Sequence, residues 1–285
     1  RGGVVSRYRH AGAFVGRHRS RKVGASLDFS DYRNYSPGDD PRLLDWALYA
    51  RTNRLYLKVF EAEDDLAVHL LLDGSASMWE ARIPPAEGKP PAKIVTALRL
   101  SAAVGYVALS DLDRVSAHVF CEGIVSSSDL LRGPGQFRSL VDFLSHVPST
   151  PTQTKLLPAA RQLMKRLRGG GVCVVVSDFL VRDWPTALRM LASRFELRLI
   201  ILRSAWDEEP IRPGEYELID SESEDSLRLV VTSELLASYR KLLDDHHGQI
   251  VSFASRRGFA VLTLRENEEL DGALLRRMID AGILR

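Results

Sequence analysis

The sequence predicts an α/β fold with a doubly wound, mainly parallel sheet, preceded by a small N-terminal region rich in strands and turns. Two observations support this prediction. From residue 66 onward, short apolar runs alternate with segments of helical periodicity, which is the pattern of a parallel sheet with helices on both faces. The 285 residues are 45% hydrophobic and 27% charged, so the chain can bury a substantial core.

Five apolar runs are of the kind that is buried on both faces of a parallel sheet. These predicted strands are residues 66–72, 114–121, 172–177, 197–202 and 259–264. Helical patterns cover residues 93–109, 135–146, 157–167, 184–195, 233–256 and 268–281. Thr232 or Ser233 is a candidate N-cap for the longest of these helices, and Gly258 is a candidate stop.

Three segments interrupt the alternation, and binding loops usually lie at such places. Residues 79–92 contain four prolines and are expected to form a loop, while residues 204–231 form an excursion with two β-like runs. The third segment is the N-terminal region. It has a turn at residues 37–39, a predicted strand at 55–60 and three aromatic side chains expected in a small core, Tyr32, Tyr35 and Trp46. We therefore predict two domains, residues 1–62 and 63–285.

The net charge of +2 is the sum of unequal parts. Residues 1–60 hold 12 Lys or Arg against 5 Asp or Glu, whereas the rest of the chain holds 27 against 32. The longest run without Asp, Glu, Lys or Arg is 12 residues and the chain has two cysteines, Cys121 and Cys173. We therefore expect no membrane span, no disulfide and a cytoplasmic location.

Oxygen-bearing side chains follow the first predicted strand of the larger domain. Asp73, Ser75 and Ser77 occupy alternating positions in a loop, and Asp178 directly follows the strand at 172–177. Ligand sites of open α/β sheets lie at the carboxyl ends of their strands, and hard oxygen donors suit Mg²⁺ or Mn²⁺. Thr154, in the loop before a predicted helix, is a candidate for a further ligand.

These residues resemble the metal-ion-dependent adhesion site of von Willebrand factor type A domains, which is written DxSxS, T and D. The five matching positions are Asp73, Ser75, Ser77, Thr154 and Asp178. Thr150 and Thr152 lie nearby, but the usual Thr-x-Leu spacing is found at Thr154 and Leu156. The likeness implies a Rossmann-like sheet and a divalent cation. Lys155 is a departure, because type A domains more often have Asp or Asn after the threonine.

Residues 24–51 resemble the signature of the bacterial "domain of unknown function 58" family, which precedes a type A-like domain. The matching residues are Gly24, Tyr32, Arg33, Tyr35, Pro37, Gly38, Asp39, Asp40, Arg42, Asp45, Trp46, Ala50 and Arg51, and further matches fall at 58–61, Lys93, 113–115 and 177–179. This likeness covers most of the chain. It implies a cytoplasmic protein that works beside MoxR-type AAA+ ATPases as an adaptor or a component of a chaperone system, without an established catalytic activity.

The expected function is metal-dependent protein binding, in which a partner's Asp or Glu completes the coordination of the cation. The partner is a MoxR-type AAA+ ATPase, another protein that presents such a carboxylate, or both. Residues expected at a partner surface are Trp79, Lys155, Arg33, Asp39, Asp40, Arg42, Asp45 and Arg51. For the last five, a turn capped by aspartates and held by arginine pairs is the alternative.

Two other functions compete with this interpretation. An Asp at a strand end also serves as a nucleophile in Mg²⁺-dependent phosphate-ester hydrolases, but those resemble DxDxT, and Ser75 stands where they have the second carboxylate. The basic arm at residues 1–22 fits a nucleic-acid-binding module, although no zinc spacing or helix-turn-helix accompanies it. His69 is expected to be a core residue, and His246 and His247 surface residues.

Overall fold

The computed structural model describes residues 28–61, 66–79, 93–148, 154–208, 211–219, 226–266 and 268–284. The chain divides into two compact units, a smaller one within residues 11–65 and a larger one that takes in residues 66–285. Three predicted segments lie wholly or partly outside the described residues: the basic arm at 1–22, most of the proline-rich segment at 79–92 and part of the excursion at 204–231.

The smaller unit is an antiparallel pair of strands with two short helices in its connection. Its elements are β1 (Asp28–Asn34), η1 (Pro41–Leu43), α1 (Trp46–Thr52) and β2 (Tyr56–Glu61). The expectation of an aromatic core here is wrong for two of the three side chains, because Trp46 is 61% exposed and Tyr32 is 37% exposed. Trp46 is the first residue of α1 and contacts Tyr49, an exposed residue of the same helix.

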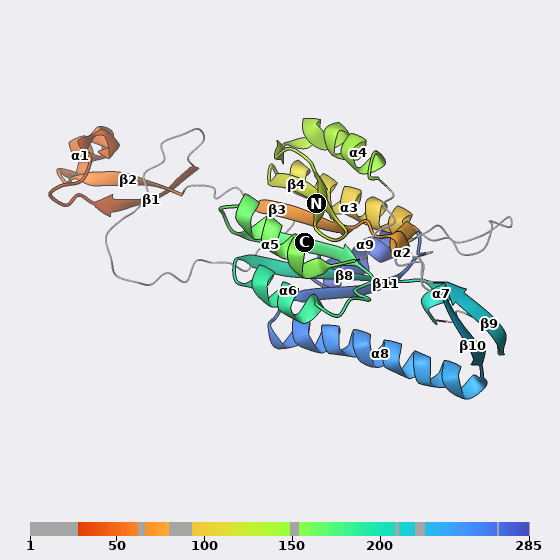
Figure 1. Cartoon of the computed structure of the whole chain (residues 1–285). Coiled ribbons are helices and arrows are strands. Elements are labelled where there is room, and N and C mark those ends of the chain that lie inside the picture. The colour runs from red at the N-terminus through yellow and green to blue at the C-terminus, as the bar shows by residue number, and fades with distance from the viewer. Residues whose placement is uncertain are drawn as a thin grey trace. The chain divides into compact units, whose positions relative to one another are not determined.

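The larger unit is built on a seven-stranded, mainly parallel sheet with the order β11-β8-β7-β3-β4-β5, in which β6 also pairs with β4 (Figure 1). The parallel strands are β3 (Ala67–Asp73), β4 (Arg114–Phe120), β7 (Gly171–Ser177), β8 (Phe195–Arg203) and β11 (Ala260–Arg265). The predicted α/β class and its mainly parallel sheet are therefore confirmed. Two short antiparallel strands, β5 (Ile124–Ser127) and β6 (Leu131–Arg132), are additions to the five predicted strands.

Helices cover both faces of this sheet, so each face carries its own hydrophobic core (Figure 1). One face packs against α3 (Lys93–Ser110), α4 (Phe137–Ser145), which follows η2 (Pro134–Gln136), and α9 (Gly272–Asp280). The other face packs against α5 (Leu156–Arg166), α6 (Trp184–Ala192) and α8 (Ser233–Arg256). Among the described helices, α3 is long and apolar enough to cross a membrane, but about half of it is buried in this core.

The predicted excursion at 204–231 leaves the central sheet. It begins with a single helical turn, α7 (Ala205–Glu208), and continues as an antiparallel pair, β9 (Gly214–Ile219) and β10 (Ser226–Val231). The chain then enters α8, where the Thr232 hydroxyl accepts a hydrogen bond from the Leu235 amide and caps the helix.

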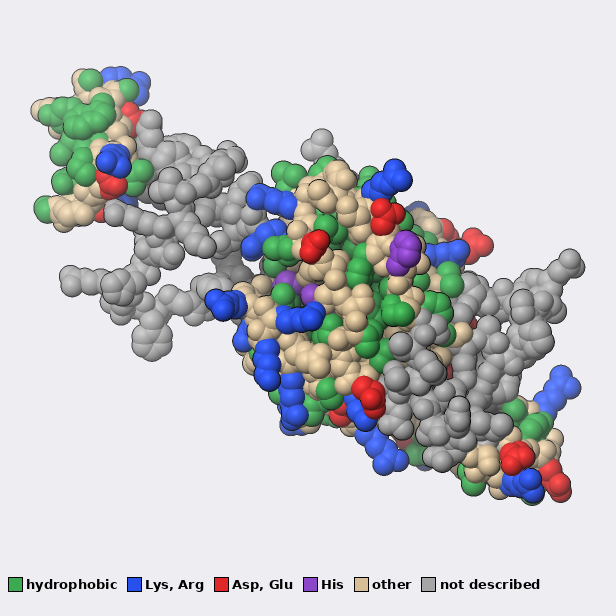
Figure 2. Space-filling view, turned by 45° about the horizontal axis from the view of Figure 1, so that its top comes forward, with side chains coloured by type: hydrophobic (Ala, Val, Ile, Leu, Met, Phe, Trp, Pro, Cys, Tyr) green, Lys and Arg blue, Asp and Glu red, His purple; other side chains and the backbone are tan. Residues whose placement is uncertain are grey.

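The surface of the larger unit is mixed in charge. Figure 2 shows Lys and Arg side chains spread over one face, with a smaller number of Asp and Glu side chains among them.

Candidate metal centre

The candidate site lies where the strand order of the sheet reverses. From β3 the chain passes through α3 to β4 on one side, and it later returns to place β7 on the other side of β3. Loops leaving β3 and β7 therefore diverge at the carboxyl edge of two neighbouring strands, which is where open α/β sheets bind ligands. Asp73 ends β3 and Asp178 follows β7, so both side chains lie at this reversal.

Four of the five predicted ligands come together at this edge. The hydroxyl oxygens of Ser75 and Ser77 lie 3.2 Å apart, and the Ser77 hydroxyl donates to Asp178 Oδ2 over 3.3 Å. Asp73 Oδ1 accepts from the backbone amide of Ser75 at 3.0 Å. Residues about 100 positions apart in the chain are thus joined in one hydrogen-bonded cluster.

Asp73 is completely buried at the centre of this cluster. Its second oxygen accepts a hydrogen bond of 2.6 Å from the Ser177 hydroxyl, a residue that the motif does not include. Burial, and then the negative charge of Asp178, raise the pKa of Asp73 to about 7. A nearby cation would stabilise the ionised form of this carboxyl group.

The loop after Asp73 is held close to β4. The Gly74 amide donates to the Phe120 carbonyl oxygen at 2.8 Å. A Cβ atom on residue 74 would lie only 2.6 Å from Val119 Cγ1, so glycine permits this close approach. The turn then places Ser75 and Ser77 above the strand end.

Lys93 is the functional candidate that the metal-site motif did not include. It is the first residue of α3 and 3% exposed, and its ammonium group donates to Asp178 Oδ2 at 2.7 Å and to Asp207 Oδ2 at 3.2 Å. Burial alone would lower the pKa of Lys93, but the charges of Asp178 and Asp207 raise it above its ordinary value. Burial would likewise raise the pKa of Asp178, and the contact with Lys93 holds it below its ordinary value. The available sequence signals were its match to the family pattern and its place at the start of an apolar helix.

The donor set fits a small, hard divalent cation. Mg²⁺ binds oxygens at about 2.1 Å in an octahedron, so neighbouring ligand oxygens lie about 3 Å apart. The separations from Ser77 Oγ to Ser75 Oγ and to Asp178 Oδ2, 3.2 and 3.3 Å, are close to that spacing. The described residues contain no group of three or more His, Cys, Asp or Glu arranged for a metal, and this cluster has hydroxyl oxygens beside its two carboxylates.

The fifth predicted ligand, Thr154, lies half-buried two residues before α5. The amide of the next residue, Lys155, donates to the Cys121 carbonyl oxygen at the carboxyl end of β4. This bond brings the segment to the same edge of the sheet. The membership of Thr154 in the cluster stays a prediction, and Thr150 and Thr152 lie outside the described residues.

Two predicted partner-contact residues flank this edge. The ammonium group of Lys155 pairs with Glu122 at 2.7 Å on the surface, so its charge has a local counter-ion. Trp79 is the last residue of α2 (Ala76–Trp79), whereas the sequence predicted that the proline-rich loop begins there. Its indole Nε1 is buried, and no acceptor among the described atoms lies within hydrogen-bonding distance.

The other predicted partner-contact residues stabilise the smaller unit locally. Arg33 forms a two-pronged ion pair with Asp39, with contacts of 2.6 and 2.8 Å. Asp40 caps η1 through the amide of Arg42, and Asp45 caps α1 and accepts from the Tyr32 hydroxyl. Arg51 lies in the last turn of α1. These contacts support the alternative of a turn capped by aspartates.

The expectation of two surface histidines on α8 is wrong for His247, which is buried, while His246 is half-buried. His247 is 6% exposed with Nε2 3.4 Å from the Asp178 carbonyl oxygen, and His246 Nε2 lies 2.7 Å from the Phe179 carbonyl oxygen. Burial, followed by the charge of Arg203, lowers the pKa of His247. Both rings therefore pack under the loop that carries Asp178, because α8 crosses the sheet there.

Comparison with known proteins finds a matching protein family, curated relatives and solved structures with low sequence identity. The chain is 24% identical over 261 residues to uncharacterised proteins of Mycobacterium tuberculosis and Mycobacterium bovis, covering 90% of this chain and 80% of each relative. A conserved hypothetical protein BatB from Bacteroides thetaiotaomicron superposes with a TM-score of 0.41 at 14% identity, covering 76% of this chain and 97% of that one. An aerotolerance-related membrane protein from Bacteroides fragilis gives 0.40 at 14% identity, covering 76% and 98%. The family described as "Protein of unknown function DUF58" matches residues 31–249, and the chain belongs to this family.

Proposed function

We propose that this protein is a binding module that uses a divalent cation, Mg²⁺ or Mn²⁺, to hold a carboxylate of a partner protein. In this proposal the cation is held by Asp73, Ser75, Ser77, Thr154 and Asp178, in a type A-like domain. The observation that carries the proposal is the cluster of two buried carboxylates and two serine hydroxyls at the strand-order reversal. The five-residue likeness to the adhesion-site motif supports it.

The charges of the cluster explain why an external carboxylate would bind. Serine hydroxyls are neutral ligands, so they leave the positive charge of the cation uncancelled. Lys93 neutralises part of the charge of Asp178, and Asp73 has a raised pKa. A cation held by such a set keeps a strong attraction for a further anion, and an Asp or Glu of a partner supplies one.

We propose a MoxR-type AAA+ ATPase as the partner, on the strength of the family resemblance, and a cytoplasmic setting for the complex. In this role the protein is an adaptor, and its binding to the ATPase or to a client carboxylate depends on the metal.

Metal binding and partner binding are tested in sequence. Calorimetric titration with Mg²⁺ and Mn²⁺ is expected to show one saturable site in the wild type and none in Ser75→Ala, because the substitution removes a ligand oxygen. Ser110→Ala is the matched control, since this serine is exposed and, among the described residues, its hydroxyl donates to the Tyr106 carbonyl oxygen of its own helix alone. No saturable cation binding by the folded wild type would disprove the metal site.

The partner is sought by capture from a bacterial lysate, with and without EDTA. We expect an ATPase of the MoxR type to be recovered by the wild type with Mg²⁺ and to be lost with EDTA and with Ser75→Ala. If the wild type and Ser75→Ala recover the same proteins in equal amounts, the cation does not mediate recognition.

A further inference from the structure

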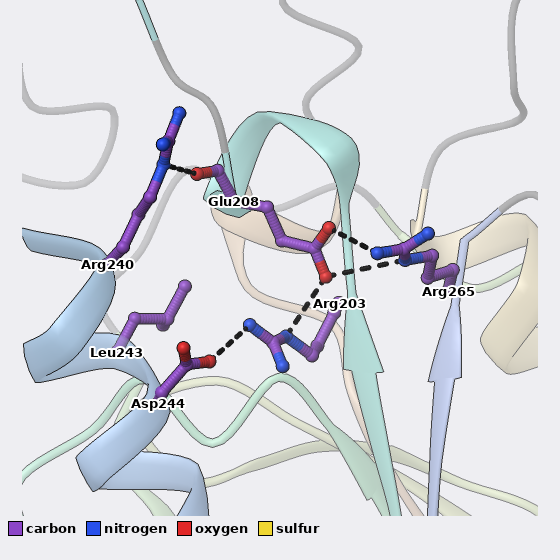
Figure 3. Close-up of a pocket in the computed structure, with 6 residues that line it drawn as sticks. All are labelled: Arg203, Glu208, Arg240, Leu243, Asp244 and Arg265. Carbon is purple, nitrogen blue, oxygen red and sulfur yellow. Dashed lines mark hydrogen bonds and ion pairs between the residues drawn. The ribbon is translucent and has the colours of Figure 1, made fainter. Parts of the chain in front are cut away.

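A cleft of about 330 Å³ lies beside the candidate metal centre, at the carboxyl ends of β8 and β11 (Figure 3). We call it the arginine cleft. It is lined by Arg203 and Arg265 at the ends of those strands, Glu208 of α7, and Arg240, Leu243 and Asp244 of α8. The three guanidinium groups come from three separate elements: those of Arg203 and Arg265 contact the Glu208 carboxylate, and that of Arg240 contacts its backbone carbonyl oxygen (Figure 3).

Glu208 occupies the anion position of the cleft. Its carboxylate contacts Arg265 Nη2 at 2.8 Å and Arg203 Nε at 3.3 Å, and its backbone carbonyl oxygen accepts from Arg240 Nε at 3.4 Å. Asp244 pairs with Arg203 from the other side at 2.9 Å. The side chain of Glu208 is 23% exposed, so an external ligand can reach it from solvent.

The charges of the lining favour a dianion. Three arginines and two carboxylates leave a net charge of +1 while Glu208 is in place. If Glu208 moves out, three arginines and Asp244 leave +2, which a phosphate dianion neutralises and a single carboxylate does not. Guanidinium groups also match phosphate oxygens in pairs, through two parallel hydrogen bonds.

We propose that the arginine cleft binds a phosphate group, which displaces the carboxylate of Glu208 from Arg203 and Arg265. The side chain of Glu208 then acts as an internal competitor that occupies the cleft when no phosphate is present. The 330 Å³ volume leaves room for an organic group attached to the phosphate, so free phosphate and a small phosphate ester share the chemistry that the cleft recognises.

The cleft shares α7 with the candidate metal centre, since Asp207 contacts Lys93 and the next residue, Glu208, contacts the arginines. Phosphate binding itself requires no metal, and it goes beyond the function proposed above. Its test is therefore run in EDTA, where a phosphate bound through a cation at Asp73 and Asp178 is not observed.

The test is a calorimetric titration of the full chain with inorganic phosphate, glycerol 3-phosphate and acetate, in EDTA. We expect saturable phosphate binding by the wild type, tighter binding by Glu208→Gln, and binding weakened by about ten-fold or more in Arg265→Gln, which is the loss of one charge-assisted hydrogen bond. Arg189→Gln is the matched control, because the bonds of this exposed arginine to described residues all lie within α6. Circular dichroism and thermal melting establish that each variant is folded.

The outcomes separate the alternatives. Tighter binding of glycerol 3-phosphate than of phosphate supports a phosphate-ester ligand, and equal binding supports free phosphate. If neither the wild type nor Glu208→Gln binds phosphate, the cleft is a structural ion-pair network and the proposal is overturned. Acetate binding as tight as phosphate, or an equal loss in Arg189→Gln, overturns it as well. None of these results depends on whether the cation site exists.

Discussion

At the scale of single residues, Lys93 has the most direct effect on the candidate metal centre. Its ammonium group lies 2.7 Å from Asp178 Oδ2, the oxygen that also accepts from Ser77. A cation ligated by this oxygen therefore competes with a resident positive charge. The lysine would limit how strongly the proposed site attracts a metal ion, and its contact with Asp178 stabilises the ionised form of that carboxyl group.

Replacing Lys93→Met is expected to raise Mg²⁺ affinity by about ten-fold or more, because Asp178 and Asp207 lose their counter-ion. The same change should lower the free energy of unfolding in EDTA by about 3 kcal/mol, the usual cost of breaking a buried ion pair. Calorimetry and urea unfolding measure the two effects. Lys165→Met, an exposed lysine of α5, should change neither quantity, and an unaltered Mg²⁺ affinity in Lys93→Met would contradict the competition.

A buried histidine pair makes a separate residue-scale prediction. His69 Nδ1 and His118 Nε2 both contact the Ser116 hydroxyl, at 2.8 and 3.0 Å, which agrees with the expected core position of His69. Burial, then the charges of His118 and Arg114, lower the pKa of His69 to about 4. Burial, then the charge of Arg166, lower the pKa of His118 to about 4. Both rings are therefore neutral at neutral pH.

The unfolded chain takes up these protons near the ordinary histidine pKa of about 6.5, before the folded chain does. The free energy of unfolding should therefore fall as the pH drops from about 6.5 to about 4, by roughly 3 kcal/mol for each histidine. Urea unfolding at pH 7 and pH 4.5 measures this loss in the wild type and in the double variant His69→Gln, His118→Gln, where it should be smaller. The exposed His146→Gln should behave as the wild type, and an equal loss in the double variant would contradict the assignment.

At the scale of elements, the end of α8 shows how a local signal stops a helix. Gly258 has a φ of +68°, its amide donates to the Ser255 carbonyl oxygen, and the Phe259 amide donates to that of Ala254. These two bonds are the Schellman pattern, in which glycine takes the left-handed position after the helix. The predicted stop at Gly258 and the predicted N-cap at Thr232 are both confirmed.

Two glycine substitutions in this region should have opposite signs. Gly258→Ala should lower the free energy of unfolding by about 1 kcal/mol, because alanine disfavours a positive φ. Gly248→Ala, inside α8, should raise it by up to about 1 kcal/mol, because its added Cβ has no atom within 4 Å and alanine favours the helix. Thermal or urea unfolding measures both changes. A stabilising Gly258→Ala would show that the left-handed conformation is not required.

The elements that the sequence did not predict are short or lack a pattern of their own. β5 and β6 have four and two residues. They form by pairing with β4 along the edge opposite to β3. α1 has seven residues and none of them is buried, so its helical conformation depends on the Asp45 cap and not on an apolar face. Periodicity does not detect such elements, because pairing and capping form them.

At the scale of the whole molecule, the order of the strands is what creates the candidate sites. β7 is inserted next to β3 although α3, β4 and α5 separate them in the chain, and this brings Asp178 to Ser77. The turn α7 contributes to both candidate sites, because Asp207 contacts Lys93 of the metal centre and Glu208 contacts Arg265 of the arginine cleft. The six residues that line the arginine cleft are spread between positions 203 and 265, and no motif in the sequence connected them.

The sequence by itself determined the five parallel strands and six long helices of the larger unit, both ends of α8 and the positions of Asp73 and Asp178 at strand ends, because these depend on periodicity and on neighbours within a few residues. It did not determine the contacts of Lys93, the burial of His247, or the exposure of Trp46. Only the tertiary structure decided these, because burial and charge pairing arise when distant segments pack against each other. The family resemblance pointed to Lys93, and the fold gave that residue its two carboxylate partners.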